Sequence, residues 1–176
     1  GLIDLSARLR EPGFEYKATL ESEMDAAVAG GVTSLACAPD TDPPLDEPGL
    51  VEMLKFRARS LRRANVFPLG ALTQGLKGGR LTEMAELHDA GCVGFSQADA
   101  PIADNQVLMR ALEYATTFGF CVWLRAQEAS LARGDGRQLG RQVGGPGDED
   151  GEQVGGGQVV AAEPRGEQLG GRLEDR

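Results

Sequence analysis

Gly-Leu-Ile-Asp-Leu-Ser-Ala-Arg-Leu-Arg-Glu-Pro-Gly, residues 1–13, is the stretch from which the architecture of this chain is read. Its apolar residues predict a strand at Leu2–Leu5. Because alternate residues of a strand share a face, four polar side chains are expected to project toward one pocket. They are Asp4, Ser6, Arg8 and Arg10.

Short apolar runs alternate with amphipathic stretches along the following 110 or so residues, a pattern typical of parallel βα units with the helices outside the sheet. Further strands are expected at Val32–Ala38, Val66–Leu72, Cys92–Ser96 and Phe120–Leu124. Helices are expected at Leu20–Ala29, Pro48–Arg63, Thr82–Asp89 and Asn105–Phe118, with Gly30, Gly91 and Gly119 closing three of them. The sequence therefore predicts an α/β fold.

Several motifs resemble the dihydroorotase branch of the amidohydrolase superfamily. Residues 1–13 match its Asp-x-His-x-His-x-Arg followed by Glu-Pro-Gly, except at the two histidines. The resemblance continues through 30–35, 39–43 and 70–76, and it covers nearly all of residues 1–132. It implies part of a TIM-type (β/α)8 amidohydrolase barrel, with about the first five strands and four helices, and a site at the carboxyl ends of the strands.

The family's metal ligands are replaced in this chain. Ser6 and Arg8 stand at the two histidine positions of the first strand, and Arg125 stands where the family strand ends in His-Ala-Glu. Gln97 lies where the family places an aspartate ligand, with Asp99 one or two positions late. A guanidinium stays protonated and offers no lone pair to a cation. We therefore expect no metal, no cofactor and no catalytic residue here, and zinc only in active relatives.

Two further positions resemble vestiges of substrate binding. Arg10 matches the family arginine that grips the substrate carboxylate, although it is equally suited to a structural bridge with Asp4, Glu11 or Asp40. Asp40 replaces a family asparagine, and an acid there would repel an anionic substrate. Arg8 and Arg125 either form a pocket for a carboxylated pyrimidine or carbamoyl aspartate, or they neutralise neighbouring acids.

A retained frame without metal ligands predicts a non-catalytic dihydroorotase-like protein of pyrimidine biosynthesis. The resemblance implies a structural partner, aspartate carbamoyltransferase, with which such subunits assemble. Two alternatives stay open. One is an active zinc dihydroorotase that hydrolyses the cyclic amide of dihydroorotate, and the other is a decayed or truncated gene product with at most anion binding.

Composition sets the remaining expectations. A net charge of -9 over 176 residues disfavours nucleic acid and anionic membranes as partners. No apolar run approaches the roughly 18 residues of a membrane span and no secretion signal is seen, so the cytoplasm is expected. Three widely spaced cysteines, Cys37, Cys92 and Cys121, indicate buried reduced thiols. The arginine-rich segment 57–63 is expected to be a solvated helix face.

The amino-acid composition of the sequence changes near residue 133. Residues 133–176 hold 13 of the 25 glycines, with no aromatic residue and no apolar periodicity. We expect two regions: 1–132, the N-terminal part of a dihydroorotase-like barrel, and 133–176, a Gly-rich tail that is disordered or a frameshift product. The chain is accordingly expected to be a fragment of the full barrel, which typically needs about 250 residues.

Overall fold

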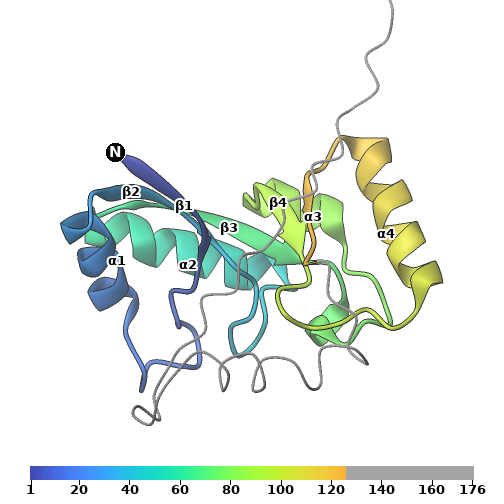
Figure 1. Cartoon of the computed structure of the whole chain (residues 1–176), viewed down its shortest axis with the longest axis horizontal. Coiled ribbons are helices and arrows are strands. Elements are labelled where there is room, and N and C mark those ends of the chain that lie inside the picture. Colours follow the sequence, from blue (N-terminus) through green and yellow to red (C-terminus); the bar gives the residue numbers. More distant parts are fainter. Residues whose placement is uncertain (126–176) are drawn as a thin grey trace, which may run out of the picture.

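The computed structural model describes residues 1–125, which form one parallel sheet of five strands in the order β1-β2-β3-β4-β5 (Figure 1). The elements in chain order are β1 (Leu2–Ala7), α1 (Leu20–Ala29), β2 (Val32–Cys37), α2 (Pro48–Leu61), β3 (Asn65–Ala71), the 3-10 turn η1 (Gln74–Leu76), α3 (Met84–Ala90), β4 (Gly94–Ser96), α4 (Asn105–Phe118) and β5 (Val122–Trp123). Sequential parallel strands joined through helices are the first half of a (β/α)8 barrel, so the predicted fold class is confirmed.

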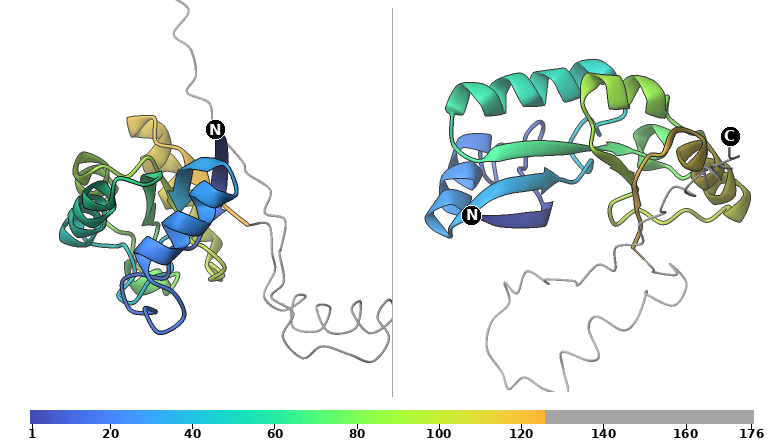
Figure 2. Two further views of the ribbon diagram at one scale, coloured as in Figure 1. Left: turned by 90° about the vertical axis from the view of Figure 1, so that its left-hand side faces the viewer. Right: turned by 90° about the horizontal axis from the view of Figure 1, so that it is seen from above.

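The helices cover the outer side of the sheet, and α2 and α3 run side by side along it (Figure 2). Each helix turns a stripe of apolar residues toward the strands. The helix residues at the core include Leu20, Met24, Val51, Leu54, Met84, Leu87, Ala111 and Ala115. They pack with strand residues such as Leu35, Cys37, Phe95 and Val122. Burial of these side chains, rather than helix propensity, holds the layers together.

The ends of the elements differ from the sequence predictions in ways that local chemistry explains. Helices α1 and α4 match their predicted ranges, but α2 ends at Leu61 because Arg62 adopts the left-handed conformation, with φ 53°. Helix α3 begins at Met84 rather than Thr82, since the Thr82 hydroxyl donates to the carbonyl of Ala71 at 2.6 Å and holds the preceding loop against the sheet. The last two strands are shorter than predicted.

The first strand does not keep the alternation expected for its polar residues. Strand β1 ends at Ala7, and its register with β2 shifts between Asp4 and Ala7. Arg10 lies beyond the strand with φ 60°, a conformation that only a few per cent of non-glycine residues adopt. The prediction that Asp4, Ser6, Arg8 and Arg10 share one strand face is therefore wrong beyond Ala7.

Glu11 anchors the turn that follows β1. Its side chain is buried, with 4% exposed, and one oxygen accepts the backbone N–H of Leu20 at 2.8 Å at the start of α1. Its other oxygen forms an ion pair with Arg57 of α2. One carboxylate thus ties the loop after β1 to two helices, satisfying an orphan N–H of a helix first turn.

Cys37 and Cys92 are buried and Cys121 is half-buried, and all three are free thiols. Within residues 1–125, no helix combines the length and the apolar character needed to cross a membrane. The predictions for residues 126–132 of the first region and for the Gly-rich segment 133–176 lie outside the described residues.

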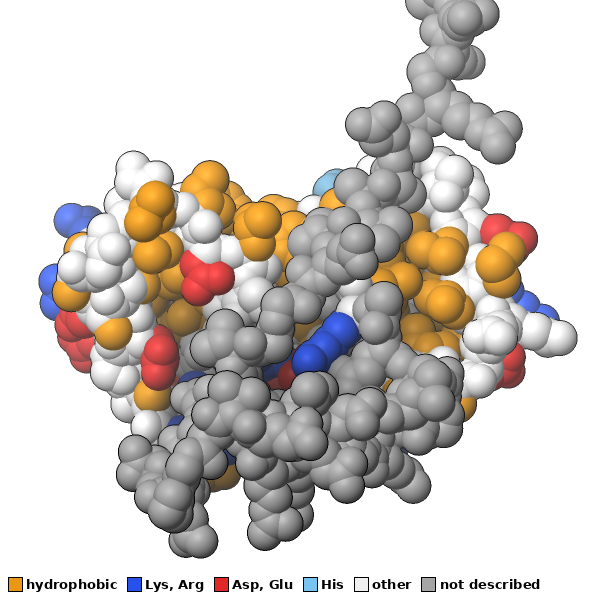
Figure 3. Space-filling view, in the orientation of Figure 1, with side chains coloured by type: hydrophobic (Ala, Val, Ile, Leu, Met, Phe, Trp, Pro, Cys, Tyr) orange, Lys and Arg blue, Asp and Glu red, His pale blue; other side chains and the backbone are white. Residues whose placement is uncertain are grey.

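Strand β1 is an edge of the sheet as far as the structure describes it. Its residues Leu2, Ile3 and Leu5 are 63%, 67% and 50% exposed. Hydrophobic side chains are prominent on the face shown in Figure 3. An edge with exposed apolar side chains is a surface that favours association.

Candidate functional site

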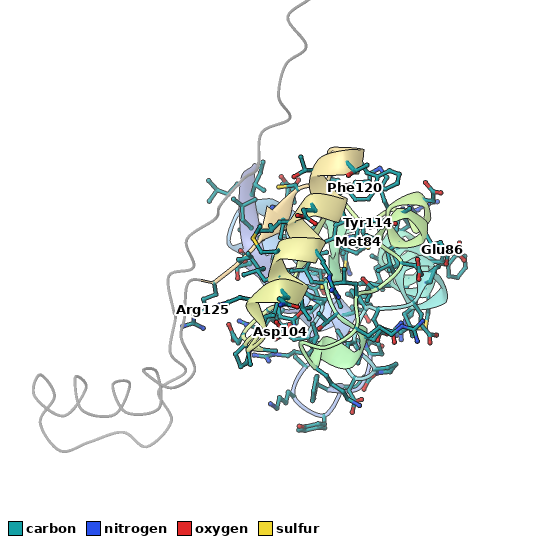
Figure 4. All side chains as sticks on the ribbon, turned by 90° about the vertical axis from the view of Figure 1, so that its right-hand side faces the viewer. Met84, Glu86, Asp104, Tyr114, Phe120 and Arg125 are labelled. Carbon is teal, nitrogen blue, oxygen red and sulfur yellow. The ribbon has the colours of Figure 1, made fainter. Side chains whose placement is uncertain are left out.

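Four charged side chains meet at the carboxyl ends of the strands. Arg8 follows β1, Asp40 follows β2, Asp99 follows β4 and Arg125 follows β5. In parallel α/β folds functional groups gather at the carboxyl ends of the strands, because all the strands point the same way. Figure 4 shows Arg125 at the end of the molecule where α4 begins at Asp104, whereas Phe120 lies at the opposite end.

The four side chains form one continuous network of ion pairs. Arg8 Nε donates to Asp40 Oδ2 at 2.7 Å, and Arg8 Nη2 donates to Asp99 Oδ2 at 2.6 Å. Arg125 Nη1 donates to the other oxygen of Asp99 at 2.8 Å. These are short charge-assisted hydrogen bonds. Arg8 thereby links the ends of β1, β2 and β4, and Arg125 adds the end of β5.

The network balances two positive charges with two negative ones. The Arg8 and Asp40 side chains are 31% and 29% exposed, while Arg125 and Asp99 are 37% and 53% exposed. Pairs this accessible to water stabilise a fold by about 1 kcal/mol or less each. Their larger effect is on chemistry, since an incoming anion must compete with Asp40 and Asp99 for the same guanidinium groups.

The residues at this site do not fit a hydrolytic zinc centre. Arg8 and Arg125 place guanidinium groups at this site, and these groups have no lone pair for a cation and would repel it. The carboxylates of Asp40 and Asp99 already accept hydrogen bonds from these groups. In the part of the chain that the structure describes, no three His, Cys, Asp or Glu side chains are grouped so that they could hold a metal ion.

Gln97 turns away from the charged network. Its side chain is buried, with 3% exposed, and its amide Nε2 donates to Thr73 Oγ1 at 2.8 Å. The same hydroxyl oxygen accepts the backbone N–H of Gly78 at 2.9 Å. A buried amide that is satisfied in this way is a structural link between the loops after β3 and β4.

Ser6 lies on β1, and Arg10 lies in the turn that follows that strand. Ser6 is exposed on β1, and its backbone N–H donates to Asp4 Oδ1 at 2.9 Å. The carbonyl of Arg10 accepts the N–H of Phe14 at 2.9 Å in the turn that follows. Among the acids considered as partners for Arg10, Asp40 pairs with Arg8 and Glu11 pairs with Arg57.

Sequence reasoning missed the part played by Asp99. It was recognised only as an acid displaced from the family's ligand position, yet it is the carboxylate that both arginines share. A signal was present in the sequence: two arginines and two aspartates follow four strands of one parallel sheet. Charges of opposite sign that lie together at the carboxyl ends of the strands are expected to pair.

The strand order, the outer helices and the position of the site define an α/β protein with the first half of an amidohydrolase-type TIM barrel. Among solved structures, the L-hydantoinase (dihydropyrimidinase) of Arthrobacter aurescens superposes with a TM-score of 0.65 at 20% identity. The match covers 82% of this chain and 33% of the hydantoinase. At that identity the likeness concerns the fold alone.

The sequence comparison is more specific. The family described as Dihydro-orotase-like matches residues 1–135, and the chain belongs to this family. A dihydroorotase-like protein of Pseudomonas aeruginosa is 49% identical over 134 residues, covering 76% of this chain and 32% of the relative. A dihydroorotase of Pelobacter propionicus is 47% identical over 131 residues, covering 74% and 31%. The chain thus spans about a third of the length of these relatives.

Proposed function

We propose that this chain is part of a non-catalytic dihydroorotase-like protein of pyrimidine biosynthesis, whose barrel serves as a structural partner of aspartate carbamoyltransferase. The observation that carries the proposal is the arginine–aspartate network at the family's ligand positions. The guanidinium groups of Arg8 and Arg125 supply internal positive charge where active relatives use a metal cation. The strand ends are then held together without a metal.

The network also argues against strong binding of the family's anionic substrate. A carboxylate has to displace Asp40 or Asp99 from Arg8 before it can use that guanidinium. Breaking a short charge-assisted pair offsets most of what a new pair of the same kind contributes. The frame is kept while the groups for substrate turnover are replaced, and a partner-binding role accounts for this combination.

A catalytic assay tests the first half of the proposal. The full chain is incubated with dihydroorotate in the presence of added zinc, and carbamoyl aspartate is measured by chromatography. We expect no product above the protein-free control, with or without chelator. Turnover that disappears when a chelator is added would establish the second candidate, an active zinc dihydroorotase.

A binding assay tests the second half. The chain is mixed with aspartate carbamoyltransferase, and the mass of the eluting species is measured by size-exclusion chromatography with light scattering. Co-elution at one defined mass is expected. Separate elution of two well-folded proteins would contradict the partnership for this part of the barrel and favour a decayed gene product.

A further inference from the structure

A second site lies at the opposite end of the sheet from the charged network. We propose that a cavity between the end of α2 and the starts of β3 and β4 binds a small organic phosphate, with the phosphate on its basic side chains and the organic body on its apolar floor. The cavity has a volume of about 460 Å³. This is within the roughly 300–1,000 Å³ range of small-molecule sites.

The lining of the cavity is basic in a chain that is acidic as a whole. Four cationic side chains and one amide surround it: Lys55, Arg59, Arg62, Arg63 and Asn65. None of its lining residues is an aspartate or a glutamate, although the chain carries a net charge of -9. A concave surface of one sign concentrates ligands of the opposite sign.

Two of these four cations already have a partner within the chain, and the other two remain available to a ligand. Arg63 pairs with Asp25 of α1 at 2.7 Å, and Lys55 Nζ donates to the carbonyl of Ala90 at 3.0 Å. Arg59 and Arg62, by contrast, form no ion pair with another residue in the range 1–125. Like charges gathered around a cavity repel one another, and a dianion between them removes that repulsion.

The backbone at Arg62 supports a role beyond helix capping. Arg62 is the residue that ends α2, and it adopts the left-handed conformation with φ 53° and ψ 41°. Glycine is favoured at such positions because it has no Cβ, as at Gly91 and Gly119 of this chain. An arginine that occupies a position favouring glycine is a local outlier in the lining of the cavity, and such outliers cluster at ligand sites.

Compensation of the helix dipole does not account for the whole cluster. The carboxyl end of a helix carries about half a negative charge, which one nearby cation already offsets. Arg59 lies in the last turn of α2 and meets that need. Three further cations surround the same cavity, which is more positive charge than the helix dipole requires. The cluster is therefore more than the solvated helix face expected from the sequence. Arg57, from the same segment, does not line the cavity and pairs with Glu11 instead.

The apolar part of the cavity lining indicates an organic ligand rather than a bare anion. Its apolar lining residues are Ala58, Ala64, Val66, Phe67 and Val93. Phe67 and Val93 are 41% and 46% exposed, so a flat apolar body has hydrophobic surface to cover. Arg59 and Arg62 are then the cations available to its phosphate.

Calorimetric titration of the full chain at low salt tests the proposal, with phenyl phosphate as the probe and inorganic phosphate as the comparison. We expect saturable binding of one phenyl phosphate, and weaker binding of inorganic phosphate. Arg59→Gln and Arg62→Gly should each weaken phenyl phosphate binding about tenfold. Arg110→Gln removes an exposed cation of α4 that does not line the cavity, so it should leave the affinity unchanged.

The Arg62→Gly variant keeps the test independent of folding, because glycine suits the left-handed conformation and should preserve or raise the melting temperature. Absence of saturable phenyl phosphate binding would overturn the proposal. Equal losses in Arg59→Gln and Arg110→Gln would overturn it as well, since they would show attraction without a site. Binding of inorganic phosphate as tight as that of phenyl phosphate would rule out the organic body.

Discussion

At the scale of single residues, Arg8 is the side chain on which the charged network depends. Its planar guanidinium donates in two directions, to Asp40 and to Asp99, and so joins the ends of β1, β2 and β4. Arg8 sets what the site can do, because an arginine holds carboxylates together but cannot activate water as a metal does.

Replacement of Arg8 by methionine should show how much the network contributes to the free energy of unfolding. Methionine keeps an apolar stem but removes the charge, leaving Asp99 paired with Arg125 alone. We expect a loss of about 1 kcal/mol in the free energy of unfolding at low salt, and a smaller loss at high salt. Urea denaturation measures it. An equal loss in Arg110→Met would show that the network contributes nothing.

The buried cysteines give the protein a pH dependence on the alkaline side. Burial raises the pKa of the Cys37 and Cys92 thiols to about 12 in each case. An unfolded thiol has a pKa of about 8.5, so between about pH 8.5 and pH 12 the unfolded chain binds fewer protons and stability falls as pH rises. Each thiol contributes a slope of up to about 1.4 kcal/mol per pH unit.

The variant Cys92→Ser isolates this effect, because serine does not titrate in that range. We expect its unfolding free energy to fall less steeply between about pH 9 and 10.5 than that of the natural chain. Parallel slopes for the two proteins would contradict the assignment. Chemical denaturation at a series of pH values provides the comparison.

At the scale of elements, the glycines that end the helices are not equivalent. Gly119 closes α4 with φ 69°, whereas Gly30 closes α1 with φ -80°. A Cβ at Gly119 meets no atom within 4 Å, and one at Gly30 lies 3.4 Å from the carbonyl of Ala27. Space is therefore adequate at both, and only the backbone conformation distinguishes them.

Alanine at these two positions should give opposite results. Gly119→Ala forces a Cβ into the left-handed region and should lower the free energy of unfolding by about 1 kcal/mol. Gly30→Ala should be neutral or slightly stabilising, because alanine restricts the unfolded chain without straining the folded one. Thermal melts of both variants check this, and equal destabilisation would show that sterics rather than the backbone decide.

The sequence was informative about elements and less so about their ends. Apolar periodicity and the terminal glycines predicted α1 and α4 at the observed residues, since both signals are local. The end of α2 at Leu61 was missed because a left-handed arginine has no sequence signature. The shortness of β5, Val122–Trp123, depends on pairing with β4, which is a tertiary property.

The candidate site was also predictable only in part, because sequence motifs locate strand ends but do not give the directions of side chains. The family frame located the strand ends that carry Arg8, Asp40 and Arg125, and these residues do meet there. Two features depended on side-chain directions that spacing does not give. Asp99 is the shared partner of both arginines, and Gln97 turns to the buried Thr73.

At the scale of the whole molecule, the feature with the clearest physical consequence is β1, which is an edge strand of the sheet within residues 1–125. Its exposed Leu2, Ile3 and Leu5 favour association, and the net charge of -9 opposes it. We expect the chain to self-associate as its concentration or the salt concentration rises.

Ile3→Lys places a charge on that edge and should reduce self-association, which dynamic light scattering measures across a concentration series. Val28→Lys is the matched control, because it changes the net charge equally at an exposed residue of α1. Equal effects of the two variants would attribute the change to net charge instead of the edge. A natural chain that stays monomeric throughout would contradict the expectation itself.

Loss of metal binding at the site of Arg8 and Arg125 is tested most directly by a zinc titration of the metal-free full chain. The natural chain is compared by calorimetry with the triple variant Ser6→His/Arg8→His/Arg125→His, which restores imidazoles at three family positions. We predict no saturable zinc binding by the natural chain, and binding of zinc by the variant. Tight binding of one zinc by the natural chain, lost in Asp40→Asn/Asp99→Asn, would contradict the account.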